Sequence, residues 1–285
     1  PNVHNIAIDG SFDDAQAMVK RMFADQEVTN LFSISAVNSI NWARLMAQVV
    51  YYFYAASQLG APHRKIAFSV PTGNFGDVFA GYVASKMGLP IERLIVATNV
   101  NDILHRALSA GDYSTGTVTP TAAPSMDIQV SSNFERLLFD LEGRDGIKTA
   151  ARMTDFEKNH NMQLEPGMRE TAASLFTSHR VDPDDMSLAM RWAQDKAGQI
   201  IDPHSAIGLS AAQNVDLDPS VPVVTLATAH PAKFPDAVER ATGIRPALPR
   251  RVGDLFDREE KYTKLPGDYD AVKDFIMSNA TPTDG

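Results

Sequence analysis

The chain has 285 residues, of which 44% are hydrophobic and 21% are charged, enough to bury one large core or two modest ones. A net charge of −9, with basic residues dispersed except between Arg245 and Arg251, argues against a nucleic-acid partner, and the absence of cysteine excludes disulfides, thiolate zinc sites and cysteine nucleophiles. No apolar run reaches the roughly 20 residues of a membrane span, so we expect a cytoplasmic enzyme or binding protein without a membrane partner.

Strand-like and helix-like segments alternate along the chain, which favours an α/β fold with a largely parallel sheet. In order, the pattern predicts a strand at residues 3–8, a helix at 12–25, a strand at 31–36, a long helix ending at 59, a strand at 66–69, a helix at 78–87, a strand at 94–98 and a helix at 101–109. A loop rich in Ser, Thr, Gly and Pro follows at 111–124. Helices are then expected at 133–141, 148–159, 167–179 and 183–197, a last strand at 222–227, and surface helix and loop at the end.

The long helix that ends at residue 59 is expected to begin at Asn38 or Ser39, because either side chain can accept hydrogen bonds from the first turn. Its large side chains include Trp42, Val49, Tyr52 and Phe53. We therefore expect this helix to be packed on several sides.

Residues 70–77, with the sequence Val-Pro-Thr-Gly-Asn-Phe-Gly-Asp, join an apolar strand to a helix and are typical of an anion-binding turn. Gly73 and Gly76 let the backbone adopt positive φ and come close to a ligand, while the first N–H groups of the helix point a partial positive charge at it. A phosphate would fit there, although such turns also occur for purely structural reasons. The dinucleotide pattern G-x-G-x-x-G and the P-loop are absent, which argues against a dinucleotide or a nucleoside triphosphate.

Residues 202–206 open another predicted helix. Asp202 as its N-cap and Pro203 at its first position account for the pattern without a ligand, and His204 is a candidate for the edge of a site. The histidines of the chain include no pair at metal-ligand spacing on one helix face, so no metal is expected.

Thr228 directly follows the last predicted strand. Ligands of open α/β sheets collect beyond the carboxyl ends of the strands, so its hydroxyl is well placed to bind one. His230 and Lys233, a few residues on, are either part of such a site or solvated loop residues.

Five short motifs in the same order resemble threonine synthase, a pyridoxal-phosphate enzyme of fold type II, in its bacterial and fungal branch. They are Asn-Ser-Ile-Asn-Trp-Ala-Arg at 38–44, Pro-Thr-Gly-Asn-Phe-Gly-Asp at 71–77, Ser-Ser-Asn-Phe-Glu-Arg at 131–136, Asp-Pro-His-Ser-Ala at 202–206 and Thr-Ala-His-Pro-Ala-Lys-Phe at 228–234. Each motif alone is weak, and the five together are specific. The resemblance implies an α/β fold of the tryptophan synthase β-like type, with a parallel sheet flanked by helices.

The resemblance also implies the cofactor pyridoxal 5'-phosphate and the conversion of O-phospho-L-homoserine and water into L-threonine and phosphate, a lyase reaction of threonine biosynthesis. By the resemblance, the hydroxyl of Thr228 meets the pyridine nitrogen. The loop around the cofactor phosphate would consist of Gly73, Asn74, Phe75, Gly76 and Asp77.

The chain departs from the family at the catalytic lysine. The family places its Schiff-base lysine in an N-terminal Phe-Lys-Asp segment, and that triplet does not occur here, so the catalytic residue stays unknown. We expect the chain to correspond to the C-terminal portion of the enzyme and to be inactive alone. Residues 1–245 would form the cofactor-binding α/β region, incomplete at its N-terminus, and residues 246–285 a helix and loop extension packed on it.

Two alternatives stay open from the sequence. One is another fold-type II lyase, such as a serine or threonine dehydratase or a cysteine synthase, and the other is a non-catalytic module that binds a phosphate ligand. The oligomeric state is not predicted. The residues chemically suited to bind the substrate phosphate are Arg44, Arg136, His204 and Lys233.

Overall fold

The computed structural model describes residues 2–10, 12–35 and 37–282, and it divides the chain into two compact units. One unit combines the residues up to Val37 with those from Arg250 onward, and the other is Asn38–Pro249. The boundary expected between residues 245 and 246 lies close to the second of these divisions. The association of the two ends of the chain with each other was not expected from the sequence.

The larger unit is built on a parallel sheet of four strands in the order β4-β3-β2-β5. The strands are β2 (Ile66–Pro71), β3 (Ile91–Thr98), β4 (Phe176–Arg180) and β5 (Val223–Thr225). Every residue of β2 is buried, as expected for a central strand covered on both faces. This confirms the predicted fold class of a parallel sheet flanked by helices.

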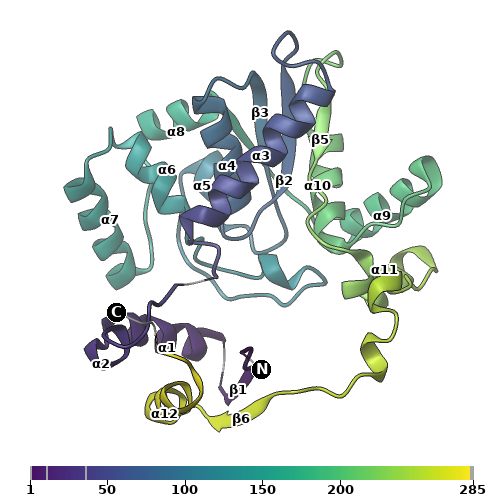
Figure 1. The fold of residues 1–285 in the computed structure, drawn as a ribbon. Coiled ribbons are helices and arrows are strands. Elements are labelled where there is room, and N and C mark those ends of the chain that lie inside the picture. Colours follow the sequence, from purple (N-terminus) through teal and green to yellow (C-terminus); the bar gives the residue numbers. More distant parts are fainter. Residues whose placement is uncertain (1, 11, 36, 283–285) are drawn as a thin grey trace. The chain divides into compact units, whose positions relative to one another are not determined.

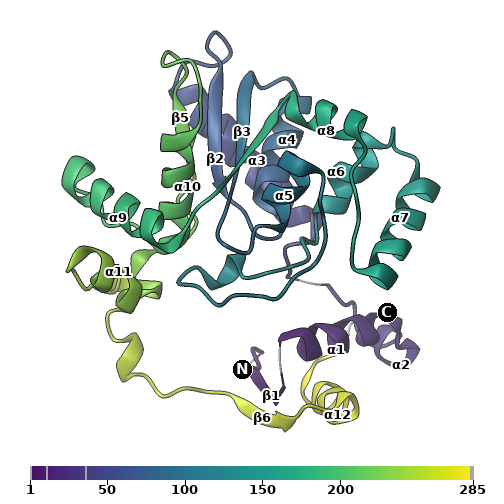
Figure 2. The same cartoon turned by 180° about the vertical axis from the view of Figure 1, so that it is seen from behind.

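Helices surround this sheet, and α3 lies in front of it in Figure 1 and behind it in Figure 2. They are α3 (Trp42–Gln58), α4 (Gly76–Lys86), α5 (Ile103–Ala110), α6 (Phe134–Leu141), α7 (Gly146–Asn159), α8 (Pro166–Ala173), α9 (Pro183–Ala197), α10 (Pro203–Asn214) and α11 (Pro235–Thr242). Short 3₁₀ helices occur at Pro124–Met126, Pro231–Lys233, Arg250–Val252 and Leu255–Asp257. None of the helices within the described residues has the length and apolar character needed to cross a membrane.

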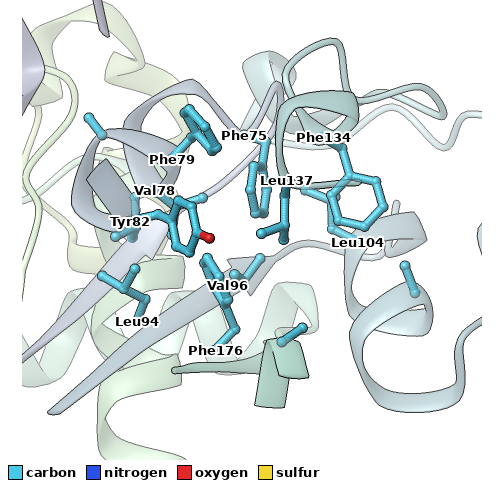
Figure 3. Packing of buried hydrophobic residues seen from close by; sticks show 14 of the residues in the cluster. Phe75, Val78, Phe79, Tyr82, Leu94, Val96, Leu104, Phe134, Leu137 and Phe176 are labelled. Carbon is cyan, nitrogen blue, oxygen red and sulfur yellow. The ribbon is translucent and has the colours of Figure 1, made fainter. Parts of the chain in front are cut away.

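The two faces of the sheet carry separate cores because side chains alternate along β3. Leu94 and Val96 pack into the larger cluster with residues of α3, α4, α5 and α6. Ile95 and Ala97 point the other way and pack into the cluster formed with α9, α10 and α11. Figure 3 shows Leu94 and Val96 beneath the aromatic side chains that close the larger core.

The smaller unit contains a two-stranded parallel sheet of β1 (Ile6–Asp9) and β6 (Thr263–Pro266). Its helices are α1 (Phe12–Ala24), α2 (Gln26–Thr29) and α12 (Tyr269–Asn279). Lys273 of α12 lies 2.8 Å from the carboxylate of Asp25, which also accepts a hydrogen bond from the hydroxyl of Tyr269. These bonds tie the two ends of the chain together within this unit.

Most predicted elements are confirmed to within a few residues, but two are wrong. No strand forms over residues 31–35, which contain only a turn and irregular backbone, and position 36 lies outside the described residues. Neither sheet offers this segment a partner, and an apolar run without a partner strand does not become one. The helix expected over 167–179 ends as α8 at Ala173, and the rest of that segment forms β4 beside β3.

The long helix α3 also differs from its prediction. Its N-cap is Asn41, whose side-chain oxygen accepts a hydrogen bond from the N–H of Ala43 at 2.9 Å, rather than Asn38 or Ser39. It is not packed on all sides within the described chain. Its buried side chains fall on one face (Leu45, Val49, Tyr52 and Ala56), while Trp42 and Phe53 are exposed.

Candidate active site

The turn between β2 and α4 is tight, as expected, but neither Gly73 nor Gly76 has the positive φ expected of it. A Cβ added at Gly73 would lie 2.5 Å from the backbone oxygen of Ser125, closer than real Cβ contacts come, so only glycine fits there. Phe75 caps α4 with a left-handed backbone (φ 60°), which is uncommon for a bulky residue. Its side chain is buried against Phe134 and Phe176, so core packing holds this conformation in place (Figure 3).

This turn forms one wall of a cavity of about 960 Å³. All six residues predicted to contact the cofactor line it, namely Gly73, Asn74, Phe75, Gly76, Asp77 and Thr228. The cavity lies at the carboxyl ends of β2 and β5, where open α/β sheets bind ligands. The first turn of α4 leaves its N–H groups without intrahelical acceptors, so the wall formed by the turn favours an anion.

Asn133 joins three of the five motifs. Its side-chain amide, fully buried, donates hydrogen bonds to the backbone oxygens of Ser39 at 3.0 Å and Asn74 at 2.9 Å. Ser131 adds a bond from its hydroxyl to the backbone oxygen of Gly73 at 2.8 Å. The motifs at 38–44 and 131–136 therefore support the turn at 71–77 through their polar side chains and backbone.

The other two motifs, at 202–206 and 228–234, contact each other. Asp202 caps α10, accepting from the N–H of His204 at 2.9 Å and that of Ser205 at 3.4 Å, which confirms its predicted capping role. The backbone N–H of Thr228 donates to the hydroxyl oxygen of Ser205 at 3.3 Å. The ring nitrogen Nε2 of His204 accepts from the N–H of Ser125 at 3.4 Å.

Asp77 is the one carboxylic acid among the described residues that line the cavity. Burial raises its pKa to about 6, and the hydrogen bond from the hydroxyl of Tyr52 offsets this only in part. That hydroxyl lies 2.8 Å from the backbone oxygen of Asp77 and 3.3 Å from its carboxylate oxygen Oδ1. Burial and the neighbouring carboxyl raise the pKa of Tyr52 well above its usual value, so Tyr52 acts here as a neutral donor.

The fold separates the four residues that are candidates for binding a substrate phosphate. Arg44 lines the cavity from α3. The guanidinium of Arg136 is engaged elsewhere, with the side chain of Asn133 at 2.9 Å and the backbone oxygen of Ile40 at 2.9 Å. His204 is buried, and it is not among the residues that line the cavity.

The two candidate residues in the loop after Thr228, His230 and Lys233, are exposed to solvent. Lys233 is exposed and lines a different cavity, of about 1030 Å³, beside Arg180 and Arg240. His230 is exposed and accepts a hydrogen bond from the N–H of Ala232 at 3.1 Å, capping a short 3₁₀ helix. Within the described residues, no cluster of three or more His, Asp or Glu side chains could hold a metal ion.

Of the α3 residues that line the cavity, only Arg44 was predicted as a candidate for binding a ligand. Gln48, Tyr51 and Ala55, which line the cavity together with Arg44, were missed. These positions recur at intervals of three and four residues, so they share one helix face, and a helical-wheel reading of the segment would have grouped them. Ser125 was also missed, because it lies in a 3₁₀ helix of three residues, which is too short to leave a periodic signal.

Two protein families match the chain. Residues 2–157 match the model described as pyridoxal-phosphate dependent enzyme, and residues 205–276 match the one described as threonine synthase, C-terminal. Threonine synthase of Pseudomonas aeruginosa is 54% identical over 98% of this chain and 60% of its own length. Threonine synthase of Corynebacterium glutamicum is 43% identical over 97% of this chain and 59% of its own length.

Solved structures agree with the sequence matches. The pyridoxal-phosphate-bound threonine synthase from Brucella melitensis superposes with a TM-score of 0.91 at 48% identity, covering 98% of this chain and 60% of that one. The yeast threonine synthase gives a TM-score of 0.87 at 38% identity, with 97% and 59% covered. The chain thus spans about 60% of the length of these relatives. It belongs to the pyridoxal-phosphate dependent enzyme family, and its resemblance to threonine synthase is confirmed.

Proposed function

We propose that this chain carries the cofactor site of a threonine synthase, which converts O-phospho-L-homoserine and water into L-threonine and phosphate. The observation that carries the proposal is the meeting of five separate motifs around one cavity, through the hydrogen bonds of Asn133, Ser131, Ser205 and His204. Motifs that arose in this order only by chance would have no reason to converge on one place. Bound pyridoxal 5'-phosphate supplies an electron sink for carbanions in this chemistry.

The residues of the chain fit this cofactor. The close approach of Gly73 to Ser125 and the left-handed cap at Phe75 shape a cradle of backbone N–H groups suited to a phosphate. Thr228 lines the same cavity from beyond the end of β5, where its hydroxyl would bind the pyridine nitrogen. A neutral hydroxyl at that nitrogen leaves the ring largely unprotonated, which moderates the electron sink.

Arg44 is our candidate for the substrate phosphate. It is the one residue of the four candidates that lines this cavity, among the residues that the structure describes. A guanidinium can bind two phosphate oxygens at once. Arg44→Lys is expected to raise KM for O-phospho-L-homoserine more than it lowers kcat.

We further propose that none of the ten lysines of the chain forms the Schiff base with the cofactor. No lysine is among the described residues that line the cavity. Lys233 follows the fifth motif closely, but its side chain lines another cavity. The 285 residues alone are therefore expected to bind the cofactor reversibly and to be inactive.

The test is a titration of the chain with pyridoxal 5'-phosphate, followed by borohydride reduction and mass spectrometry. Reversible binding without a specific lysine adduct is expected. Gly73→Ala should weaken binding at least tenfold, because the added Cβ meets backbone rather than a movable side chain. Gly167→Ala is the matched control, since a Cβ there meets nothing within 4 Å. A stoichiometric adduct on one lysine would refute the proposal that no lysine of the chain forms the Schiff base. Absence of any binding would refute the proposed cofactor site.

The reaction itself is assayed on the complete product of the gene. Release of phosphate together with threonine from O-phospho-L-homoserine is expected. Release of ammonia from L-threonine or L-serine without activity on the phosphate ester would instead identify a dehydratase. No turnover of either substrate by a protein that binds the cofactor would favour the non-catalytic binding module.

A further inference from the structure

Asp202 does more than cap α10. Its carboxylate is fully buried and, besides the two backbone N–H groups of the cap, it binds two side chains. One oxygen lies 2.9 Å from Nδ1 of His204, and the other accepts a hydrogen bond from the hydroxyl of Ser205. Burial opposes ionisation, but the hydrogen bonds from His204 and Ser205 outweigh it and hold the pKa of Asp202 below its usual value. A helix N-cap alone needs only the backbone bonds.

The side chains of Ser205 and His204 each also accept a hydrogen bond from a backbone N–H group, and the two N–H groups belong to different loops of the cavity. The hydroxyl of Ser205 donates a hydrogen bond to Asp202. The hydroxyl oxygen of Ser205 is therefore free to accept a hydrogen bond from the backbone N–H of Thr228, at 3.3 Å. His204 donates from Nδ1 to Asp202, which fixes Nε2 as the acceptor for the N–H of Ser125 at 3.4 Å. The carboxylate thus sets both the direction of the hydroxyl and the tautomer of the ring.

The two loops held in this way carry opposite parts of the proposed cofactor site. Thr228 would contact the ring nitrogen, and Ser125 is the residue whose backbone oxygen closes against Gly73 in the phosphate turn. The ring of Phe234 packs on His204 with centroids 4.8 Å apart, which keeps the imidazole in place. Asp202, His204 and Ser205 are buried and are not among the described residues that line the cavity.

We propose that Asp202, His204 and Ser205 form a positioning unit that fixes the ring-binding and phosphate-binding loops relative to each other. The unit touches no ligand and acts through Thr228 and Ser125. The inference rests on the proposed cofactor site, because it assigns a purpose to the placement of Thr228.

The first test is Ser205→Ala, with Ser210→Ala as the matched control, since Ser210 is a buried serine on the same helix. The probe is pyridoxine 5'-phosphate, which has no aldehyde, so its affinity does not depend on any lysine. Ser205→Ala removes the donor to the Asp202 carboxylate and the acceptor of the Thr228 N–H. The loss of the second, a neutral hydrogen bond that holds the loop, should weaken binding by roughly 2- to 10-fold, and Ser210→Ala should leave binding unchanged. Hydrogen exchange at the amide of Thr228 should accelerate in Ser205→Ala alone.

A double-mutant cycle separates positioning from a general loss of structure. If Ser205 acts through the Thr228 hydroxyl, then Ser205→Ala should weaken binding far less in a Thr228→Val background than in the wild type. Equal losses in both backgrounds, or unchanged exchange at the Thr228 amide, would overturn the inference while cofactor binding by the wild type stands. Failure of the wild type to bind the probe would overturn the proposed site and this inference together.

The other arm supplies an independent variant if Ser205→Ala does not fold. His204→Gln should weaken pyridoxine 5'-phosphate binding by a similar factor and accelerate hydrogen exchange at the amide of Ser125 rather than at that of Thr228. Equal exchange at Ser125 in this variant and in the wild type would contradict the unit.

Discussion

Asp77→Asn is expected to stabilise the chain at neutral pH, although it removes a charged group from the proposed active site. The introduced amide would keep an oxygen that can accept the hydrogen bond from Tyr52, and the substitution would remove the charge that burial disfavours. The substitution therefore isolates the cost of holding an ionised carboxyl at this position.

The magnitude follows from the pKa of Asp77, which burial raises from 3.8 to about 6. A folded-state pKa above the unfolded value means that the native state binds the proton more tightly, so the free energy of unfolding falls as pH rises from about 4 to 6. Each pKa unit is worth about 1.4 kcal/mol, which gives an upper bound of roughly 3 kcal/mol above pH 6. Asp77→Asn should thus equal the wild type near pH 4 and exceed its stability by about 1–3 kcal/mol at pH 7.

Urea unfolding at a series of pH values, followed by tryptophan fluorescence, measures this difference. Both tryptophans of the chain, Trp42 and Trp192, belong to the unit Asn38–Pro249 that contains Asp77, so the signal reports the right unit. Asp216→Asn, on an exposed loop, makes the same change in net charge and should show no such pH-dependent gain.

A pH-independent difference between Asp77→Asn and the wild type would refute this reasoning. A lower stability of Asp77→Asn at pH 7 would show that the N–H groups at the start of α4 stabilise the carboxylate more than burial destabilises it.

Two further substitutions test the framework of the site. Gly81→Ala should cost about 1–3 kcal/mol of unfolding free energy, because the added Cβ would lie 2.6 Å from Cε1 of Tyr52 and 2.8 Å from Cδ2 of Leu94. Thermal unfolding measures this, and a neutral result would mean that the α3–α4 contact relaxes without cost. Asn133→Ala should cost about 1–3 kcal/mol and weaken pyridoxine 5'-phosphate binding, because it removes the side-chain donor to the backbone oxygen of Ser39 and one of the two donors to that of Asn74. The exposed Asn214→Ala serves as its control in urea unfolding and ligand titration, and equal behaviour of the two variants would contradict the bridging role of Asn133.

The sequence predicted β2 and β3 well because β2 is mostly apolar and β3 contains the apolar run 94–97, which leaves little choice of structure. It failed at β4, an edge strand whose middle residues, Thr177 and Ser178, are polar and only half-buried. The preceding α8 has the composition of a good helix, and nothing local marks where it stops. The pairing with β3 decides that point, and pairing is a tertiary contact.

The candidate site shows the same division between local and distant information. Asp202 was recognised as an N-cap because the acceptor and the N–H groups it serves lie within three residues. Asp202 is linked to the loop of Thr228 through Ser205, and Ser205 and Thr228 are 23 residues apart in sequence. The sequence spacing does not indicate this hydrogen bond. The six proposed cofactor contacts came from family resemblance, and the fold brings all of them to one cavity.

Because Phe75 caps α4 with a left-handed backbone, the affinity of the turn for a ligand depends on how the hydrophobic core packs around the Phe75 side chain. The backbone of the phosphate turn adopts its conformation because a phenyl ring is locked between Phe134 and Phe176, so the cradle is preformed before any ligand arrives. Substitutions in that aromatic cluster would then change cofactor binding without touching the cofactor. Selection on cofactor binding would then constrain those buried positions more tightly than their contribution to stability requires.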